Sequence, residues 1–204
     1  MFRPSGLRTA LAATLCAASL AACTPGSGYP PPPLVALPFD AVVGAGDPTR
    51  AAVFNTAFAF GTPASLVGKP DEAARAAANF EFLTIEIPYG ARYRGLNAVL
   101  QPELEAGRVE LRTVLGVRPD APPQQVIDAL YAAARALQAG DTAAADRILS
   151  SPVFTAGGTA TLQRLAALPP MPKVATAAVH TQQELDRADR IDRFRGGGST
   201  GGRT

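Results

Sequence analysis

The sequence contains few of the side chains that commonly carry out catalysis. Its 204 residues include a single histidine, His180, only two cysteines and no tryptophan. A Ser-His-Asp or Cys-His arrangement would have to use His180, which lies in a predicted helix beside Thr181 and Gln182. One histidine without a cluster of acidic residues also makes a poor metal site. The sequence therefore predicts no catalytic residue, no metal site and no non-covalent cofactor.

The chain also lacks a hydrophobic run that could cross a bilayer near its N-terminus. The apolar run at residues 11–22 is about a dozen residues long and only moderately apolar, whereas a transmembrane helix needs about 20 apolar residues. Arg3 and Arg8 precede this run without any acidic residue. A basic start, a short apolar core and small residues at its end are typical of a secretory signal.

The end of this signal is more specific. Leu20-Ala21-Ala22-Cys23 resembles the lipobox of bacterial lipoproteins, which has an aliphatic residue, two small residues and then cysteine. The resemblance implies cleavage before Cys23, a diacylglycerol on its thiol and an acyl chain on the new amine. Thr24, in place of aspartate, favours the outer membrane, facing the periplasm. The alternative is an ordinary cleaved signal in which the cysteine is incidental.

Cleavage before Cys23 would change the composition of the chain. It would leave 182 residues without Cys16, and lipidated Cys23 would leave the folded part without a free thiol or a disulfide. The loss of Arg3 and Arg8 turns 19 basic and 17 acidic residues into 17 of each. This balance predicts no basic surface for nucleic acid.

The chain divides into four predicted parts. Residues 1–22 are the signal peptide, and residues 23–46 are the lipidated N-terminus and a proline-rich tether that contains the run at 30–33. Residues 47–194 form a single all-α domain, an irregular bundle of about five to seven helices. Residues 195–204 are a disordered glycine-rich tail.

Helical periodicity and capping residues indicate where the helices lie. Asp47-Pro48 predicts a helix start, and an apolar face follows at Val53, Phe54, Ala57, Phe58 and Phe60. A second helix begins near Pro70. Its end, residues 80–87, also alternates like a strand, but the alanine-rich residues before it favour a helix. A third helix either begins near Pro102 or is kinked there.

The second half of the domain contains a predicted αα-hairpin near residues 123–150, with a tight turn at Gly140-Asp141. The hairpin resembles one tetratricopeptide helix pair over some 25 residues. No second copy follows at the 34-residue period, so we interpret it as an ordinary hairpin. A short helix at 161–168 and a charged helix at 173–194 complete the domain. The charged helix at 173–194 is predicted to lie on the solvated surface of the domain or to bind a partner.

One loop combines residues that often anchor interfaces. Tyr89, Arg92, Tyr93 and Arg94 lie within residues 89–95, between two glycines, and tyrosine and arginine are enriched in binding hot spots. The loop is therefore a candidate surface for a partner or an anionic ligand. The alternative is structural, with the tyrosines packed against the core and the arginines neutralising nearby carboxylates.

The carboxylates that these arginines could neutralise belong to two glutamates in the preceding apolar helix. Glu81 and Glu86 would be costly to bury unless they are paired, and Arg92 and Arg94 are the expected partners. If the two glutamates instead faced a pocket, they would be candidate catalytic carboxylates.

Three functional hypotheses follow from the sequence. The preferred one is a membrane-anchored, non-enzymatic helical scaffold or accessory protein of the cell envelope, with an envelope protein as its partner. The second is a carrier of an apolar ligand such as lipid between the helices. The third is a hydrolase that uses Glu81 or Glu86.

Overall fold

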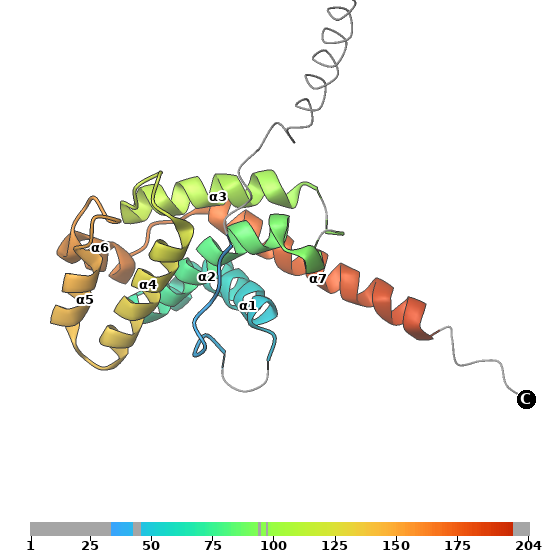
Figure 1. Cartoon of the computed structure of the whole chain (residues 1–204), viewed down its shortest axis with the longest axis horizontal. Coiled ribbons are helices and arrows are strands. Elements are labelled where there is room, and N and C mark those ends of the chain that lie inside the picture. Colours follow the sequence, from blue (N-terminus) through green and yellow to red (C-terminus); the bar gives the residue numbers. More distant parts are fainter. Residues whose placement is uncertain (1–33, 43–45, 94, 97, 198–204) are drawn as a thin grey trace, which may run out of the picture. The chain divides into compact units, whose positions relative to one another are not determined.

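The structure of the protein is a computed structural model that describes residues 34–42, 46–93, 95–96 and 98–197 (Figure 1). These residues form seven α-helices: α1 (Pro48–Gly61), α2 (Pro70–Tyr89), α3 (Leu100–Leu115), α4 (Pro123–Gln138), α5 (Thr142–Leu149), α6 (Gly158–Ala166) and α7 (Pro172–Gly197). Two short 3-10 helices, η1 (Pro63–Leu66) and η2 (Ala91–Tyr93), lie between them. Within the described ranges the one extended pairing is an isolated bridge between Val117 and Phe154. The prediction of an all-α bundle is confirmed.

The helix ends follow from local chemistry. Helices α1, α2 and α4 begin with proline, whose fixed φ suits the first helical position and whose missing N–H would have no intrahelical partner there. The Asp47 side chain accepts hydrogen bonds from two backbone N–H groups in the first turn of α1, and Asp141 caps α5 in the same way. Gly140 has a φ of 77°, which favours glycine after a helix end. The predicted start at Asp47 and the predicted turn between α4 and α5 are confirmed.

Helix α2 lies at the centre of the bundle and contacts α1, α3, α4 and α6 (Figure 1). Thirteen of its 20 residues are buried, so it presents side chains to neighbours on several faces. The buried alanines let those neighbours approach closely, because a methyl group occupies little space between helix axes; they are Ala73, Ala74, Ala76, Ala77 and Ala78. Residues 80–87 continue this helix, as the alanine-rich lead-in predicted.

Helix α3 packs against both α2 and α7. It begins at Leu100 and has Pro102 in its first turn, so the predicted start near that proline is confirmed. Gly107 lies where α3 meets its neighbours. A Cβ atom there would be 2.7 Å from Cζ of Phe80 and 3.3 Å from the carbonyl oxygen of Lys173. Only glycine leaves room for this approach.

Helix α1 buries a different set of side chains from the one predicted. Val53, Ala57 and Phe60 are buried, but Phe54 and Phe58 are exposed, so the predicted apolar face is wrong at these two positions. The physical reason is that α1 packs between α2 and α7. Alanines and threonines on the facing sides fit those contacts, and the two phenylalanines point away from them.

The two halves of helix α7 differ in how deeply their side chains are buried. Its first half lies against α1 and α3 and buries Val174, Ala178 and Leu185, whereas Phe194 near its end is 83% exposed. The first half is thus more buried than a solvated surface helix would be, and the last turns extend past the helices that α7 contacts (Figure 1).

Helix α6 begins at Gly158, about one turn before the predicted start at residue 161. A Cβ atom on Gly158 would lie 2.0 Å from the carbonyl oxygen of Asp146, so the absence of a side chain allows the first turn of α6 to approach α5.

The segment at residues 34–42 lies along α4. Ala36 and Gln124 exchange two hydrogen bonds, with N–O distances of 2.8 and 3.0 Å. Arg135, three turns later on α4, forms two hydrogen bonds with the carboxylate of Asp40. We call residues 34–42 the strap. The strap is part of the range predicted as a tether, residues 23–46.

Candidate functional site

The residues predicted to matter for function lie in different parts of the molecule. Cys23, the predicted lipidation site, lies outside the described residues, and so does Arg94. Among the others, Tyr89, Arg92 and Tyr93 lie at the end of α2 and in η2, whereas Glu81 lies more than two turns earlier in the bundle interior.

The loop at residues 89–95 uses its two tyrosines differently. Tyr93 is 7% exposed and packs into the core, while Tyr89 is exposed. Burial raises the pKa of the Tyr93 hydroxyl above its usual value. Only Tyr89 and Arg92 of the described candidate residues therefore remain open to a partner.

Arg92 neutralises a carboxylate, but not one of the two expected. Its Nη1 atom lies 2.6 Å from Oδ2 of Asp47, the residue whose other carboxylate oxygen caps α1. The Arg92 guanidinium also lies over the Tyr93 ring, 5.7 Å from the centroid. Since the Arg92 side chain is 65% exposed, this contact joins the loop to the start of α1 and leaves part of the guanidinium in solvent.

Glu86 lies near this contact and is half-buried. Burial raises the pKa of its carboxyl group above the usual value, and the negative charge of Asp47 adds to the increase. Glu86 makes no ion pair with any residue that the structure describes. A side chain on Gly90 would collide with Glu86, because a Cβ atom would lie 2.8 Å from its Oε1 atom.

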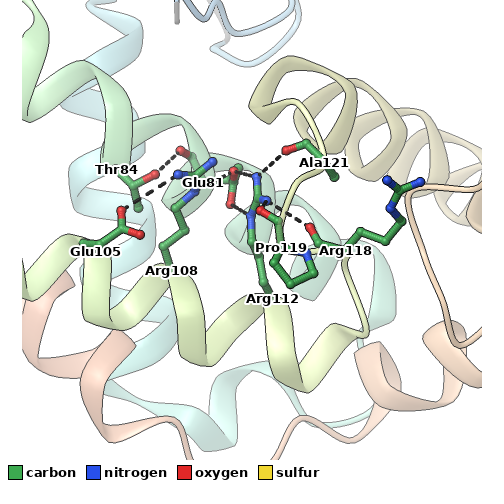
Figure 2. Close-up of polar contacts among 8 residues, drawn as sticks. All are labelled: Glu81, Thr84, Glu105, Arg108, Arg112, Arg118, Pro119 and Ala121. Carbon is green, nitrogen blue, oxygen red and sulfur yellow. Dashed lines mark hydrogen bonds and ion pairs between the residues drawn. The ribbon is translucent and has the colours of Figure 1, made fainter. Parts of the chain in front are cut away.

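Glu81 is fully buried at 0% exposure, and its partners come from α3 (Figure 2). The Nε atom of Arg108 donates to Oε1 at 3.0 Å. Arg112 donates from Nε to Oε2 at 3.2 Å and from Nη2 to Oε1 at 2.5 Å. The prediction that Arg92 or Arg94 pairs with Glu81 is therefore wrong, because α3 crosses α2 at this point and supplies two arginines one helical turn apart.

Arg112 also holds the connection between α3 and α4 (Figure 2). Nη1 donates to the carbonyl oxygens of Arg118 and Pro119 at 3.1 and 2.9 Å, and Nη2 donates to that of Ala121 at 3.0 Å. With the two bonds to Glu81, these account for the five N–H donors of a guanidinium. No donor is left for a ligand, and the arrangement is that of a structural clamp.

His180 lies away from both groups. Its Nδ1 atom is 2.9 Å from Oε2 of Glu103, in a contact between α7 and α3 that is partly exposed. Over the described ranges, histidine, cysteine and acidic side chains do not gather in a group of three that could hold a metal ion. Nor is any helix in that part of the chain long and apolar enough to cross a bilayer.

A groove that the sequence did not predict lies between α1, α2 and the strap. Its volume is about 510 Å³, and its lining includes Phe58 from α1, Arg75 from α2 and Leu37 from the strap. The sequence carries no signal for it, because Phe58 was predicted to lie on a buried face of α1. The strap could not have been expected there, because its sequence has no helical or strand periodicity.

Protein-family models, curated protein sequences and solved structures were compared with this chain, and none of them matches it.

Proposed function

We propose that this protein is a bacterial lipoprotein whose helical domain serves as a non-enzymatic scaffold or accessory protein of the cell envelope. The lipid on Cys23 would hold it at the membrane, with the domain in the periplasm. The sequence Leu20-Ala21-Ala22-Cys23 carries the proposal. Several acyl chains on one residue anchor a protein far more firmly than a single chain, which gives only marginal binding.

The strap supports a defined length for the tether. Ala36 and Asp40 contact α4, so the part of the chain between Cys23 and the domain comprises residues 24–33. At about 3.1 Å per residue in a polyproline conformation, ten residues span about 30 Å. A tether of this length would keep the domain within about 30 Å of the lipid.

The state of Glu81 argues against a hydrolase that uses this residue, although not against one that uses half-buried Glu86. Glu81 is buried against two arginines, and Arg112 has no donor left, so neither can reach a substrate without breaking the clamp. The exposed candidates for partner binding are Tyr89 and Arg92, together with the last turns of α7, where Phe194 is exposed.

The experiment that tests the anchor compares Cys23→Ala with Cys16→Ala in the full chain. Cys23→Ala should abolish labelling by radioactive palmitate and release the protein from the membrane fraction. Cys16→Ala is the matched control, because Cys16 would leave with the signal peptide and its replacement should change neither result. Labelling that persists in Cys23→Ala, or is lost only in Cys16→Ala, would contradict the proposal.

The scaffold proposal is tested by a photo-crosslinking residue placed in turn at Tyr89, Arg92 and Phe194, and, as a control, at Arg147, which is exposed on α5. Crosslinking in cells should recover the same envelope protein from Tyr89 in repeated experiments and not from Arg147. Recovery of free monomer alone from Tyr89, Arg92 and Phe194 would argue against a scaffold.

A further inference from the structure

The groove between α1, α2 and the strap has features of a ligand site. Its volume of about 510 Å³ falls within the range of about 300–1,000 Å³ that is usual for small-molecule sites. It is open to solvent, and its lining combines apolar side chains with charged and amide groups.

Arg75 is the cation of the groove. It is half-buried, and its guanidinium lies over the Tyr131 ring, 5.9 Å from the centroid. Stacking occupies the face of a guanidinium and leaves the N–H groups at its edge open. No carboxylate among the described residues forms an ion pair with Arg75, so this edge can accept a carboxylate in the bidentate geometry that arginine favours.

Two amide side chains, Asn55 and Asn79, line the groove together with Arg75. The Nδ2 atom of Asn79 donates to Oδ1 of Asn55 at 3.0 Å, and the hydroxyl of Tyr131 donates to Oδ1 of Asn79. Because the Asn55 oxygen already has a partner, the NH₂ group is the part of this groove-lining amide that is left to donate to a ligand. Asn79 and Tyr131 are buried, so the protein holds this donor in place before any ligand binds.

Two acidic residues lie on the same side of α2, one turn before Arg75. Asp71 and Glu72 both line the groove. Glu72 has Lys69 as its partner, at 3.4 Å, while Asp71 forms no ion pair with a described residue. Asp71 would repel a second negative charge and would attract an ammonium group. Exposed Phe58 and buried Leu66 supply apolar surface to the lining of the groove.

We propose that this groove binds a zwitterionic ligand with an apolar side chain, such as an amino acid or a short peptide. The carboxylate would bind Arg75 and Asn55, the ammonium group would lie beside Asp71, and the side chain would pack against Phe58. This proposal goes beyond the scaffold function and does not depend on the lipid anchor. A simple anion would meet the repulsion of Asp71, and a simple cation that of Arg75.

The test is a titration of the full chain with three probes, followed by NMR signals of the Asn55 and Asn79 side-chain amides. The dipeptide leucyl-leucine carries both charges, N-acetyl-leucine only the carboxylate, and leucinamide only the ammonium group. The dipeptide should bind at least about 10-fold more tightly than either single-charge probe, a difference of about 1.4 kcal/mol. Arg75→Gln should weaken dipeptide binding by at least about 10-fold, and Arg147→Gln, on the exposed side of α5, should not change it.

Two further variants keep the test valid if Arg75→Gln fails to fold. Asn55→Asp keeps the oxygen that accepts from buried Asn79 and removes only the NH₂ group, and Phe58→Ala changes an exposed side chain. Each should weaken dipeptide binding severalfold without a large fall in the melting temperature. The proposal is overturned if the amide signals do not move at about 10 mM dipeptide, if the three probes bind equally, or if the folded groove variants bind like the unaltered chain.

Discussion

Arg112 is a charged side chain in the interior, and it can be there because every one of its N–H donors has an acceptor within the chain. Glu81 and three backbone carbonyls from residues 118–121 provide these acceptors. A buried charge is strongly unfavourable when unpaired, so the clamp and the α3–α4 connection depend on each other.

Arg112→Met should therefore strongly destabilise the protein. The substitution leaves Glu81 buried with Arg108 as its remaining partner and removes three bonds to the connection. We expect the free energy of unfolding to fall by about 3–5 kcal/mol, measured by urea denaturation. Arg187→Met is the control. Arg187 pairs with Glu184 on the surface of α7, and its loss should cost less than about 1 kcal/mol.

A double variant distinguishes a lost charge pair from lost packing. In Glu81→Leu/Arg112→Met both charges are replaced by apolar groups, so the double variant should be more stable than Arg112→Met alone. If the losses of stability in Glu81→Leu and in Arg112→Met simply add in the double variant, Glu81 and Arg112 are not an energetically coupled pair.

Tyr131 is expected to lower the stability of the protein at alkaline pH. Burial raises the pKa of its hydroxyl from 10.0 to about 12. The folded state therefore holds this proton more tightly than the unfolded state, and its contribution is fully present below pH 10 and is lost as the pH rises to about 12. A difference of about two pKa units corresponds to at most about 3 kcal/mol.

Tyr131→Phe should flatten this decline in unfolding experiments between pH 9 and 12.5, and should lower the stability at neutral pH by about 1–3 kcal/mol because Asn79 loses its donor. Some decline should remain, since burial also raises the pKa of Tyr93. Tyr89→Phe, at an exposed position, is the control. An unchanged pH profile in Tyr131→Phe would show that this hydroxyl is not the group responsible.

At the scale of the helices, periodicity indicates that a helix has an apolar side but does not say which neighbours it meets. Helix α1 contacts α2 and α7, and its alanines rather than Phe54 and Phe58 fit between them. Helix α3 shows the same dependence at Gly107, whose place at the meeting point of three helices depends on Phe80 and Lys173.

Gly107→Ala should destabilise the protein, although alanine is the better helix former by about 1 kcal/mol. The new methyl group would collide with the ring of Phe80, which is fully buried, so that either the ring or α3 would have to shift. Overpacking of this kind costs about 1–3 kcal/mol, so we expect a net loss in thermal or urea unfolding. Val109→Ala, an exposed change on the same helix, should have almost no effect. A more stable Gly107→Ala variant would mean that α3 can shift away from Phe80.

At the scale of the whole molecule, the described residues belong to one compact unit of the chain, which comprises residues 33–204. The strap is part of that unit because Ala36 and Asp40 bind α4 and Leu37 packs against the core. The proposed anchor and the folded domain are therefore expected to be separable.

A chain that begins at Leu34 should unfold in one cooperative transition, with the same free energy of unfolding as the longer chain. A chain that begins at Gly46 lacks the strap and should be less stable by roughly 1–2 kcal/mol, because it exposes the apolar surface that Leu37 covers. Urea denaturation of the two chains measures this difference. Equal stabilities would show that the strap contributes nothing to the domain.

The sequence by itself determined the helical class, several helix ends and the αα-hairpin, because these depend on local features. Proline at the first helical position, aspartate caps and glycine after a helix act within a few residues of where they stand. The motif around Cys23 is local in the same sense, and the lipidation that it predicts stays a prediction.

Only the tertiary structure decided which distant residues meet. Glu81 pairs with Arg108 and Arg112 and not with Arg92, which is nearer to it in the sequence. In the same way, Phe58 lines a groove, and Asp40 of the strap forms an ion pair with Arg135 on α4. The physical reason is that helical periodicity gives the direction of a side chain relative to its own axis, whereas its partners are set by how the axes cross. Those crossings depend on small residues such as Gly107 and the alanines of α2, whose effect is seen only when the helices are packed together.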